Sequence, residues 1–147
     1  MQVLKLFCTA ILLFGFGGLA LFAQDELSPD SRLLAKYQEQ DLQNMLANSP
    51  EKIDFLNFSI DNSAVIIDIE SEKAQTLPVL HYFNKIDKTL GTAVVSINEG
   101  SLNIYNYYFD RKLDKAVTYR IGDTGKAIVF YSKKKLTHAY NQYRNEE

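Results

Sequence analysis

The stretch that decides the fold is Thr92–Ser132, TAVVSINEGSLNIYNYYFDRKLDKAVTYRIGDTGKAIVFYS. Apolar and polar residues alternate in four runs within it, and each run ends at a sequence that favours a turn. Alternation with a period of two, in β-branched and aromatic residues, is typical of β-strands. We therefore expect strands at Thr92–Ile97, Leu102–Phe109, Ala116–Ile121 and Lys126–Ser132.

The connections between these strands predict how they pair. Asn98–Ser101 contains Asn and Gly, and Gly122–Gly125 contains two glycines and Asp, residues that suit tight turns; the charged segment Asp110–Lys115 joins the middle strands. Connections of about 4–6 residues are too short for a parallel crossover, so the strands should form an antiparallel meander. Leu102–Phe109 has large side chains on both faces, which places it at the centre of the sheet.

Helices are expected on both sides of this stretch. Ser28-Pro29 and Ser49-Pro50 are helix-start sequences, because Ser caps free N–H groups and Pro suits the first helical position. They predict one helix from Pro29 to about Ala47 and a second from Pro50 to about Asn57 or a little further. A strand at Ala64–Ile69 would be the fifth of the sheet.

Two more helices complete the expected element order. One would run from Thr76-Leu77-Pro78 to about Lys88, and the last from Lys133 to Arg144, where apolar residues fall at helical spacing. The predicted fold class is α+β: an N-terminal helix pair and other helices packed on a mostly antiparallel four- to five-stranded meander sheet. This order of elements loosely resembles the cystatin-like and NTF2-like folds, and the resemblance implies a sheet that wraps a ligand cavity.

Residues 1–23 have the composition of a secretory signal peptide. Lys5 is the only charged side chain in them, and an uncharged, mostly apolar run follows from Leu6 to Ala23. We expect cleavage after Ala23, or after Ala20, to leave a single exported α+β domain at residues 24–147, secreted or periplasmic. The alternative is an uncleaved segment that anchors an envelope protein, and this segment is the only membrane contact that we expect.

Composition excludes several classes of function. The chain has a formal net charge of −2 and no strongly basic face, so nucleic acid is not an expected partner. Its only cysteine, Cys8, lies in the leader, so the exported chain would have no disulfide and no Cys-ligated zinc. The histidines, His81 and His138, are not arranged with metal-ligand spacing. We therefore predict no metal and no cofactor.

Asp123-Thr124-Gly125 is the sharpest candidate for catalysis. The tripeptide resembles the catalytic loop of aspartic proteases, in which two such loops bring two carboxylates together. The resemblance covers this one turn, and Gly122 and Lys126 depart from the family's flanking residues. We interpret the tripeptide as a hairpin turn. A small hydrolase that uses Asp123 or Asp41 is the alternative function.

The tyrosines favour binding over catalysis. The chain has nine tyrosines and no tryptophan, and a tyrosine ring combines apolar area with a hydroxyl group that suits binding surfaces. The candidate binding residues lie on the predicted sheet and are Tyr105, Tyr107, Tyr108, Tyr119 and Tyr131. We predict a non-enzymatic binding or accessory module that holds a protein or small-molecule ligand on an aromatic face of its sheet.

Overall fold

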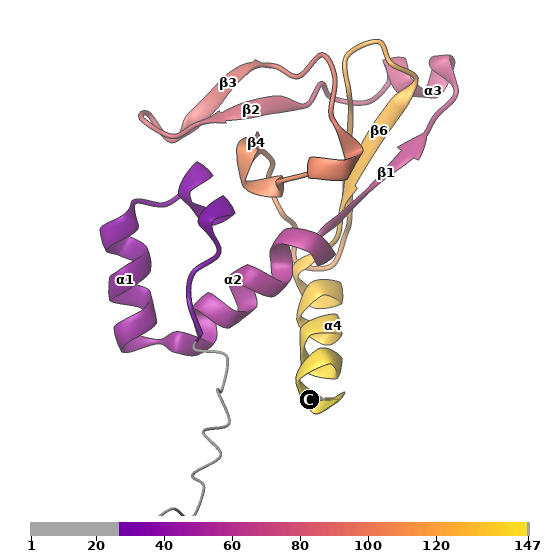
Figure 1. The fold of residues 1–147 in the computed structure, drawn as a ribbon. Helices are drawn as coiled ribbons and strands as arrows, with labels where there is room; N and C mark the ends of the chain where they lie inside the picture. Colours follow the sequence, from indigo (N-terminus) through magenta and orange to yellow (C-terminus); the bar gives the residue numbers. More distant parts are fainter. Residues whose placement is uncertain (1–26, 147) are drawn as a thin grey trace, which may run out of the picture.

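The computed structural model describes residues 27–146, so the predictions about the leader lie outside the described residues. Within 27–146 the chain has four α-helices and two separate three-stranded antiparallel sheets (Figure 1). No helix in this range is both long and apolar enough to cross a membrane. The α+β class and the antiparallel pairing are confirmed, whereas the single four- to five-stranded meander is wrong.

The first sheet contains β1 (Ala64–Asp68), β5 (Val117–Arg120) and β6 (Lys126–Phe130), in the order β1-β6-β5. The expected strand near Ala64 and the hairpin of the last two strands are therefore confirmed. The β5–β6 turn requires glycine, because Gly122 and Gly125 have φ values of 49° and 70°, a region that other residues rarely adopt. A Cβ atom on Gly122 would also lie 2.7 Å from the carbonyl oxygen of Val95.

The second sheet contains β2 (His81–Asn84), β3 (Thr89–Ala93) and β4 (Tyr107–Tyr108), in the order β3-β2-β4. The predicted helix that ends near Lys88 is therefore wrong. Asn84 explains the difference, since its side-chain oxygen accepts hydrogen bonds from the backbone N–H groups of Ile86 (3.1 Å) and Asp87 (3.3 Å). This Asx-type turn reverses the chain and lets it pair with itself as a hairpin.

The predicted central strand at Leu102–Phe109 is also wrong. The 3₁₀ helix η3 (Ile104–Asn106) lies within it, and only the two residues of β4 pair as a strand. A second 3₁₀ helix, η2 (Glu99–Ser101), forms in the predicted turn just before it. Asn98 and Asn103 begin these turns, and their side-chain oxygens accept hydrogen bonds from the N–H groups of Gly100 and Tyr105. The preceding strand also differs from its prediction, because β3 ends at Ala93 and the chain then leaves the sheet.

The N-terminal helix pair is present with changed bounds. The first predicted helix is split into the 3₁₀ helix η1 (Ser31–Ala35) and α1 (Glu39–Asn48), and the second extends as α2 (Pro50–Asn62). The interruption falls at Lys36 and Tyr37, where Tyr37 turns toward the core and its ring meets that of Tyr105 edge-on at 5.9 Å. α3 (Ser71–Gln75) is a short helix in a segment for which no element was predicted.

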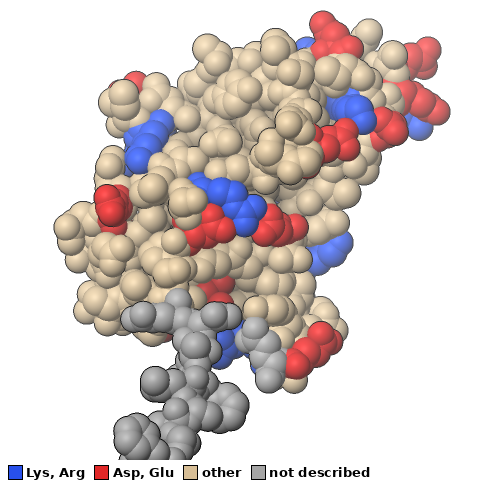
Figure 2. All heavy atoms as spheres, in the orientation of Figure 1, with Lys and Arg blue, Asp and Glu red and all other residues tan. Residues whose placement is uncertain are grey.

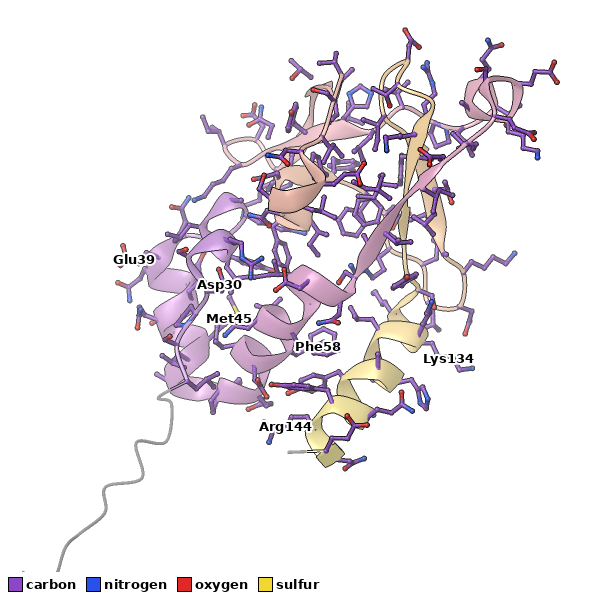
Figure 3. The ribbon with its side chains drawn as sticks, turned by 45° about the vertical axis from the view of Figure 1, so that its right-hand side comes forward. Asp30, Glu39, Met45, Phe58, Lys134 and Arg144 are labelled. Carbon is purple, nitrogen blue, oxygen red and sulfur yellow. The ribbon has the colours of Figure 1, made fainter. Side chains whose placement is uncertain are left out.

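The helices and sheets share one core. Buried side chains from η1, α1, α2, η3, β4, β6 and the loops meet in it, and among them are Leu33, Leu42, Ile53, Ile128 and Phe130. The last helix, α4 (Lys133–Glu146), confirms its prediction and packs beside α2. Figure 3 shows Phe58 of α2 pointing toward α4, where its ring lies 5.4 Å from that of Tyr140, and Met45 on the side of α1 that faces α2.

Candidate functional site

The five tyrosines predicted to bind a ligand do not lie on one face. Tyr105 and Tyr107 are buried, and Tyr107 stacks on Tyr82 with ring centroids 5.7 Å apart. Tyr108 is 39% exposed on β4. Tyr119 packs edge-on against Phe130, and the ring of Tyr131 lies beneath the ammonium group of Lys135. Of the five, Tyr105 is the one that lies near two cations, Lys36 and Arg111.

We call this group the aromatic–cation cluster: Lys36, Tyr37, Phe83, Tyr105, Phe109 and Arg111. Its members come from the end of η1, from β2, from η3 and from the loop after β4. These segments are far apart in sequence, and the split of the predicted first helix at Lys36 and Tyr37 brings the first two into the cluster.

Tyr105 is the best-fixed member of the cluster. Its hydroxyl group and that of Ser59 on α2 are 2.6 Å apart, and both residues are buried. Burial raises the pKa of Tyr105 to about 12, although the hydrogen bond with Ser59 works in the opposite direction. Burial also raises the pKa of Tyr37. Both tyrosines therefore remain neutral hydroxyl groups at ordinary pH and do not neutralise a nearby cation.

Arg111 has unsatisfied hydrogen-bond donors. Its Nε and Nη2 atoms are buried and have no hydrogen-bond acceptor within residues 27–146. Its guanidinium carbon lies 5.2 Å from the centroid of the Phe109 ring, which in turn stacks on Phe130 with centroids 3.7 Å apart. Burial lowers the pKa of Arg111 from its ordinary value. The side chain nevertheless stays charged, because an arginine is not deprotonated in proteins.

Lys36 is the second cation of the cluster. Although the residue is solvent-exposed, its Nζ atom lies 5.5 Å from the ring centroid of Phe83 and 5.9 Å from that of Tyr105. Partial burial over these rings, and next the positive charge of Arg111, lower the pKa of Lys36. Two cations therefore repel each other over aromatic rings, and no ion pair with a carboxylate joins either of them in the described part of the chain.

Neighbouring acids are engaged elsewhere. Asp110 directly precedes Arg111 in sequence but forms its ion pair with Lys112. Each of the other three arginines has a carboxylate within salt-bridge distance: Arg32–Asp30 (2.8 Å), Arg120–Asp123 (3.1 Å) and Arg144–Asp54 (2.6 Å). Figure 2 shows charged side chains of both signs gathered near α3, whereas the surface over β2 and β3 has few.

The predicted catalytic acids lie in separate elements. Asp123 is in the β5–β6 turn with its side chain 100% exposed, and its only ion pair within residues 27–146 is with Arg120. Asp41 is exposed in the first turn of α1. No hydrogen bond or ion pair in this range brings the two together. They therefore do not form the pair of carboxylates that an aspartic protease requires.

The histidines are also apart. The Nδ1 atom of His81, on β2, lies 2.9 Å from the carbonyl oxygen of Gly91, and His138 is exposed on α4. In the part of the chain that the structure describes, no group of three or more His, Cys, Asp or Glu residues is placed to hold a metal ion.

Two open hollows lie away from the aromatic–cation cluster. One, of about 310 Å³, includes Asp54, Phe58 and Tyr143 between α2 and α4. The other, of about 550 Å³, includes Arg32, Asp61 and Glu99. The charged groups that line both hollows include carboxylates, and Arg32 is already paired with two of them. Neither hollow therefore presents an unpaired charge comparable with Arg111.

Of the six residues in the cluster, sequence reasoning found only Tyr105 and missed Lys36, Tyr37, Phe83, Phe109 and Arg111. The one available signal was the order Phe109-Asp110-Arg111-Lys112, in which one acidic residue is followed directly by two basic residues. The position of Lys36 depends on the break between η1 and α1, and that of Phe83 on a hairpin where a helix was expected.

Comparisons with known proteins give no relative for this chain. No protein-family model matches it, and neither a curated protein nor a solved structure matches it significantly.

Proposed function

We propose that this chain is an exported, non-enzymatic binding module whose ligand places an anionic group against Lys36 and Arg111. The observation that carries the proposal is the buried guanidinium of Arg111, two of whose nitrogens have no acceptor within residues 27–146. A buried donor without a partner costs about 1–3 kcal/mol, and more for a charged group. A ligand that supplies the missing acceptor recovers this free energy, and the recovered free energy contributes to the affinity of the protein for that ligand.

The chemistry of the cluster favours a carboxylate or a phosphate. Arginine binds both groups with two parallel N–H···O bonds, and lysine adds a second positive charge. Burial is the main cause of the lowered pKa of Lys36 and the charge of Arg111 the second, and an anion beside both side chains offsets this second cause. The sides of the cluster are rings, namely Phe83, Tyr37, Tyr105 and Phe109, so a ligand that carries a flat apolar body next to its anionic group fits better than a bare ion.

Binding requires a small rearrangement of side chains. Nε and Nη2 of Arg111 are buried in the free protein, whereas Lys36 is exposed and has a long flexible side chain. We propose that Lys36 meets the anion first and that its movement gives access to the guanidinium.

Phenyl phosphate is the probe that tests the proposal, with inorganic phosphate and phenol as its two halves. Binding can be followed by calorimetry and by the NMR signals of the tyrosine rings, using the full chain in the form that an exporting host yields. We expect phenyl phosphate to bind more tightly than either half. Lys36→Gln and Arg111→Gln should each weaken binding by about tenfold, the value of one lost charge-assisted hydrogen bond.

Lys52→Gln is the matched control, because Lys52 is an exposed lysine on α2 with no ion pair inside residues 27–146. It should bind phenyl phosphate like the unmodified chain. If Lys52→Gln weakened the binding of phenyl phosphate as much as Lys36→Gln, the binding would be general charge attraction, and a specific site at the cluster would be refuted. An unmodified chain that binds none of the three probes would refute it as well.

A further inference from the structure

β1 is an open edge of the first sheet. The opposite edge, β5, is covered by residues 78–80, since Arg120 donates its N–H to the carbonyl of Pro78 and Leu80 donates to that of Arg120, both at 2.9 Å. β1 pairs with β6 on one side, and no strand of the described chain pairs with it on the other. In Figure 1 the outer side of β1 is free of other elements except α3 near its end.

The hydrogen-bond pattern shows which backbone groups of β1 face outward. Tyr131 donates its N–H to the carbonyl of Ser63, and Ile69 donates to that of Gly125, both at 2.8 Å. The β1–β6 register is continuous between these bonds. In an antiparallel pair, bonded and non-bonded residues alternate. Val65 and Ile67 therefore bond to β6, whereas the N–H and C=O groups of Ala64, Ile66 and Asp68 point away from it.

The side chains of β1 give no protection against pairing. Natural open edges are usually blocked by proline, lysine or a bulge. The strand AVIID contains none of these, and its register with β6 shows no bulge. Val65 and Ile67 are 39% and 40% exposed. The only charge is that of Asp68 at the end of the strand, and Lys126 on β6 lies 3.3 Å from it.

We propose that β1 pairs antiparallel with β1 of a second copy of this chain, around a two-fold axis at Ile66. The outward-facing residues then meet each other: Ile66 faces its own counterpart, and Ala64 faces Asp68 of the other copy. This register forms up to about six main-chain hydrogen bonds. It joins the two first sheets into one continuous sheet across the axis.

The register suits a second copy because β1 is complementary to itself. On the exposed face, Val65 lies beside Ile67 of the other copy, so two exposed apolar pairs become covered. The two Asp68 carboxylates fall at opposite ends of the paired strands, each opposite an alanine, so no like charges face each other across the axis. Such a reciprocal contact is the geometry of an isologous two-fold dimer.

Sedimentation over a range of concentrations tests the proposal on the full chain in the form that an exporting host yields. We expect a monomer–dimer equilibrium that Ile67→Lys shifts to monomer, because each lysine would replace an apolar contact with Val65 of the other copy and the two like charges would lie close together on either side of the axis. Ile86→Lys is the matched control, since Ile86 is 91% exposed and lies in the β2–β3 turn. It should dimerise like the unmodified chain. A circular-dichroism melt of each variant verifies that it is folded.

Hydrogen exchange tests the register itself. The amides of Ala64, Ile66 and Asp68 should gain protection as concentration rises, whereas those of Val65 and Ile67 are protected at every concentration by their bonds to β6. A monomer at all concentrations would overturn the proposal, including the case in which β1 accepts a strand only from another protein. A dimer that survives Ile67→Lys, or one without the added protection at Ala64, Ile66 and Asp68, would overturn it too.

Discussion

Arg32 and Arg111 have opposite electrostatic surroundings within one small fold. Arg32 lies between two carboxylates, with Nη2 at 2.8 Å from Asp30 and Nη1 at 2.6 Å from Asp61, and these bonds raise its pKa. Arg111 lies among aromatic rings, has no ion pair in the described part of the chain, and its pKa is lowered by burial. The first arginine joins η1 to the end of α2, so its role is structural.

The difference between the two regions teaches how a candidate site can be separated from the scaffold. The ion pairs of Arg32 offset the cost of placing its charge in the fold. Lys36 and Arg111 have no such ion pairs in the described part of the chain, so their partial burial costs free energy that folding alone does not recover. Natural proteins retain such a cost mainly at functional sites. Three predictions test whether the two regions differ in this way.

The largest expected effect is on Tyr105, which connects the two regions. Its ring supports Lys36 and Tyr37, and its hydroxyl group contacts Ser59, two residues before Asp61. Tyr105→Ala should lower the free energy of unfolding by about 3–5 kcal/mol, the cost of removing a buried ring. Tyr105→Phe should cost about 1 kcal/mol for the lost hydrogen bond. Urea unfolding followed by circular dichroism measures both, and equal costs for the two variants would contradict the packing described.

The two arginines should respond with opposite sign to the same substitution. Arg111→Met removes a buried charge with no partner and keeps the apolar volume, so we expect the free energy of unfolding to rise by about 1–2 kcal/mol. Arg32→Met leaves two carboxylates without their cation, and because these ion pairs are partly exposed the loss should be about 1 kcal/mol. The two variants are controls for each other in the same urea titration. A loss of stability in both would show that Arg111 is a structural residue like Arg32.

The first sheet was largely predictable from sequence because its signals are local. β5 and β6 alternate on either side of Gly122 and Gly125, whose positive φ values suit the turn between them. β1 has a run of β-branched residues just after Asp61-Asn62-Ser63, which interrupts the preceding pattern, although the exact end of the helix before it was not predicted. Alternation and turn chemistry act over a few residues, so a single sequence contains them.

The second sheet was not predictable because side chains that hydrogen-bond to their own backbone decide it. Asn84 and Asn103 each replace a regular helix or strand with a turn, and neither residue changes the apolar pattern around it. The aromatic–cation cluster depends on both turns, since they place Phe83 and Tyr105. The sequence pattern indicated tyrosines as binding residues, but which of them lies beside a charge is decided by contacts between distant segments.

The smallest expected effect is on how the free energy of unfolding falls at acid pH. It involves Arg32 and Asp30 and does not involve the aromatic–cation cluster. The hydrogen bonds from Arg32 lower the pKa of Asp30 below its ordinary value of 3.8. A carboxyl group whose pKa is lower in the folded state adds stability above its unfolded pKa, and this stability is lost as pH falls through the folded pKa. Because the pair is partly exposed, the contribution should be about 0.5 kcal/mol. The free energy of unfolding can be measured by urea titration at neutral pH and at successive steps below about pH 4.

In Arg32→Met, the fall in this free energy on acidification should be smaller than in the unmodified chain by that amount. In Arg111→Met, it should be the same as in the unmodified chain. An acid loss that changes equally in both variants would mean that Arg111 also acts on a carboxylate, and the contrast between the two regions would fail.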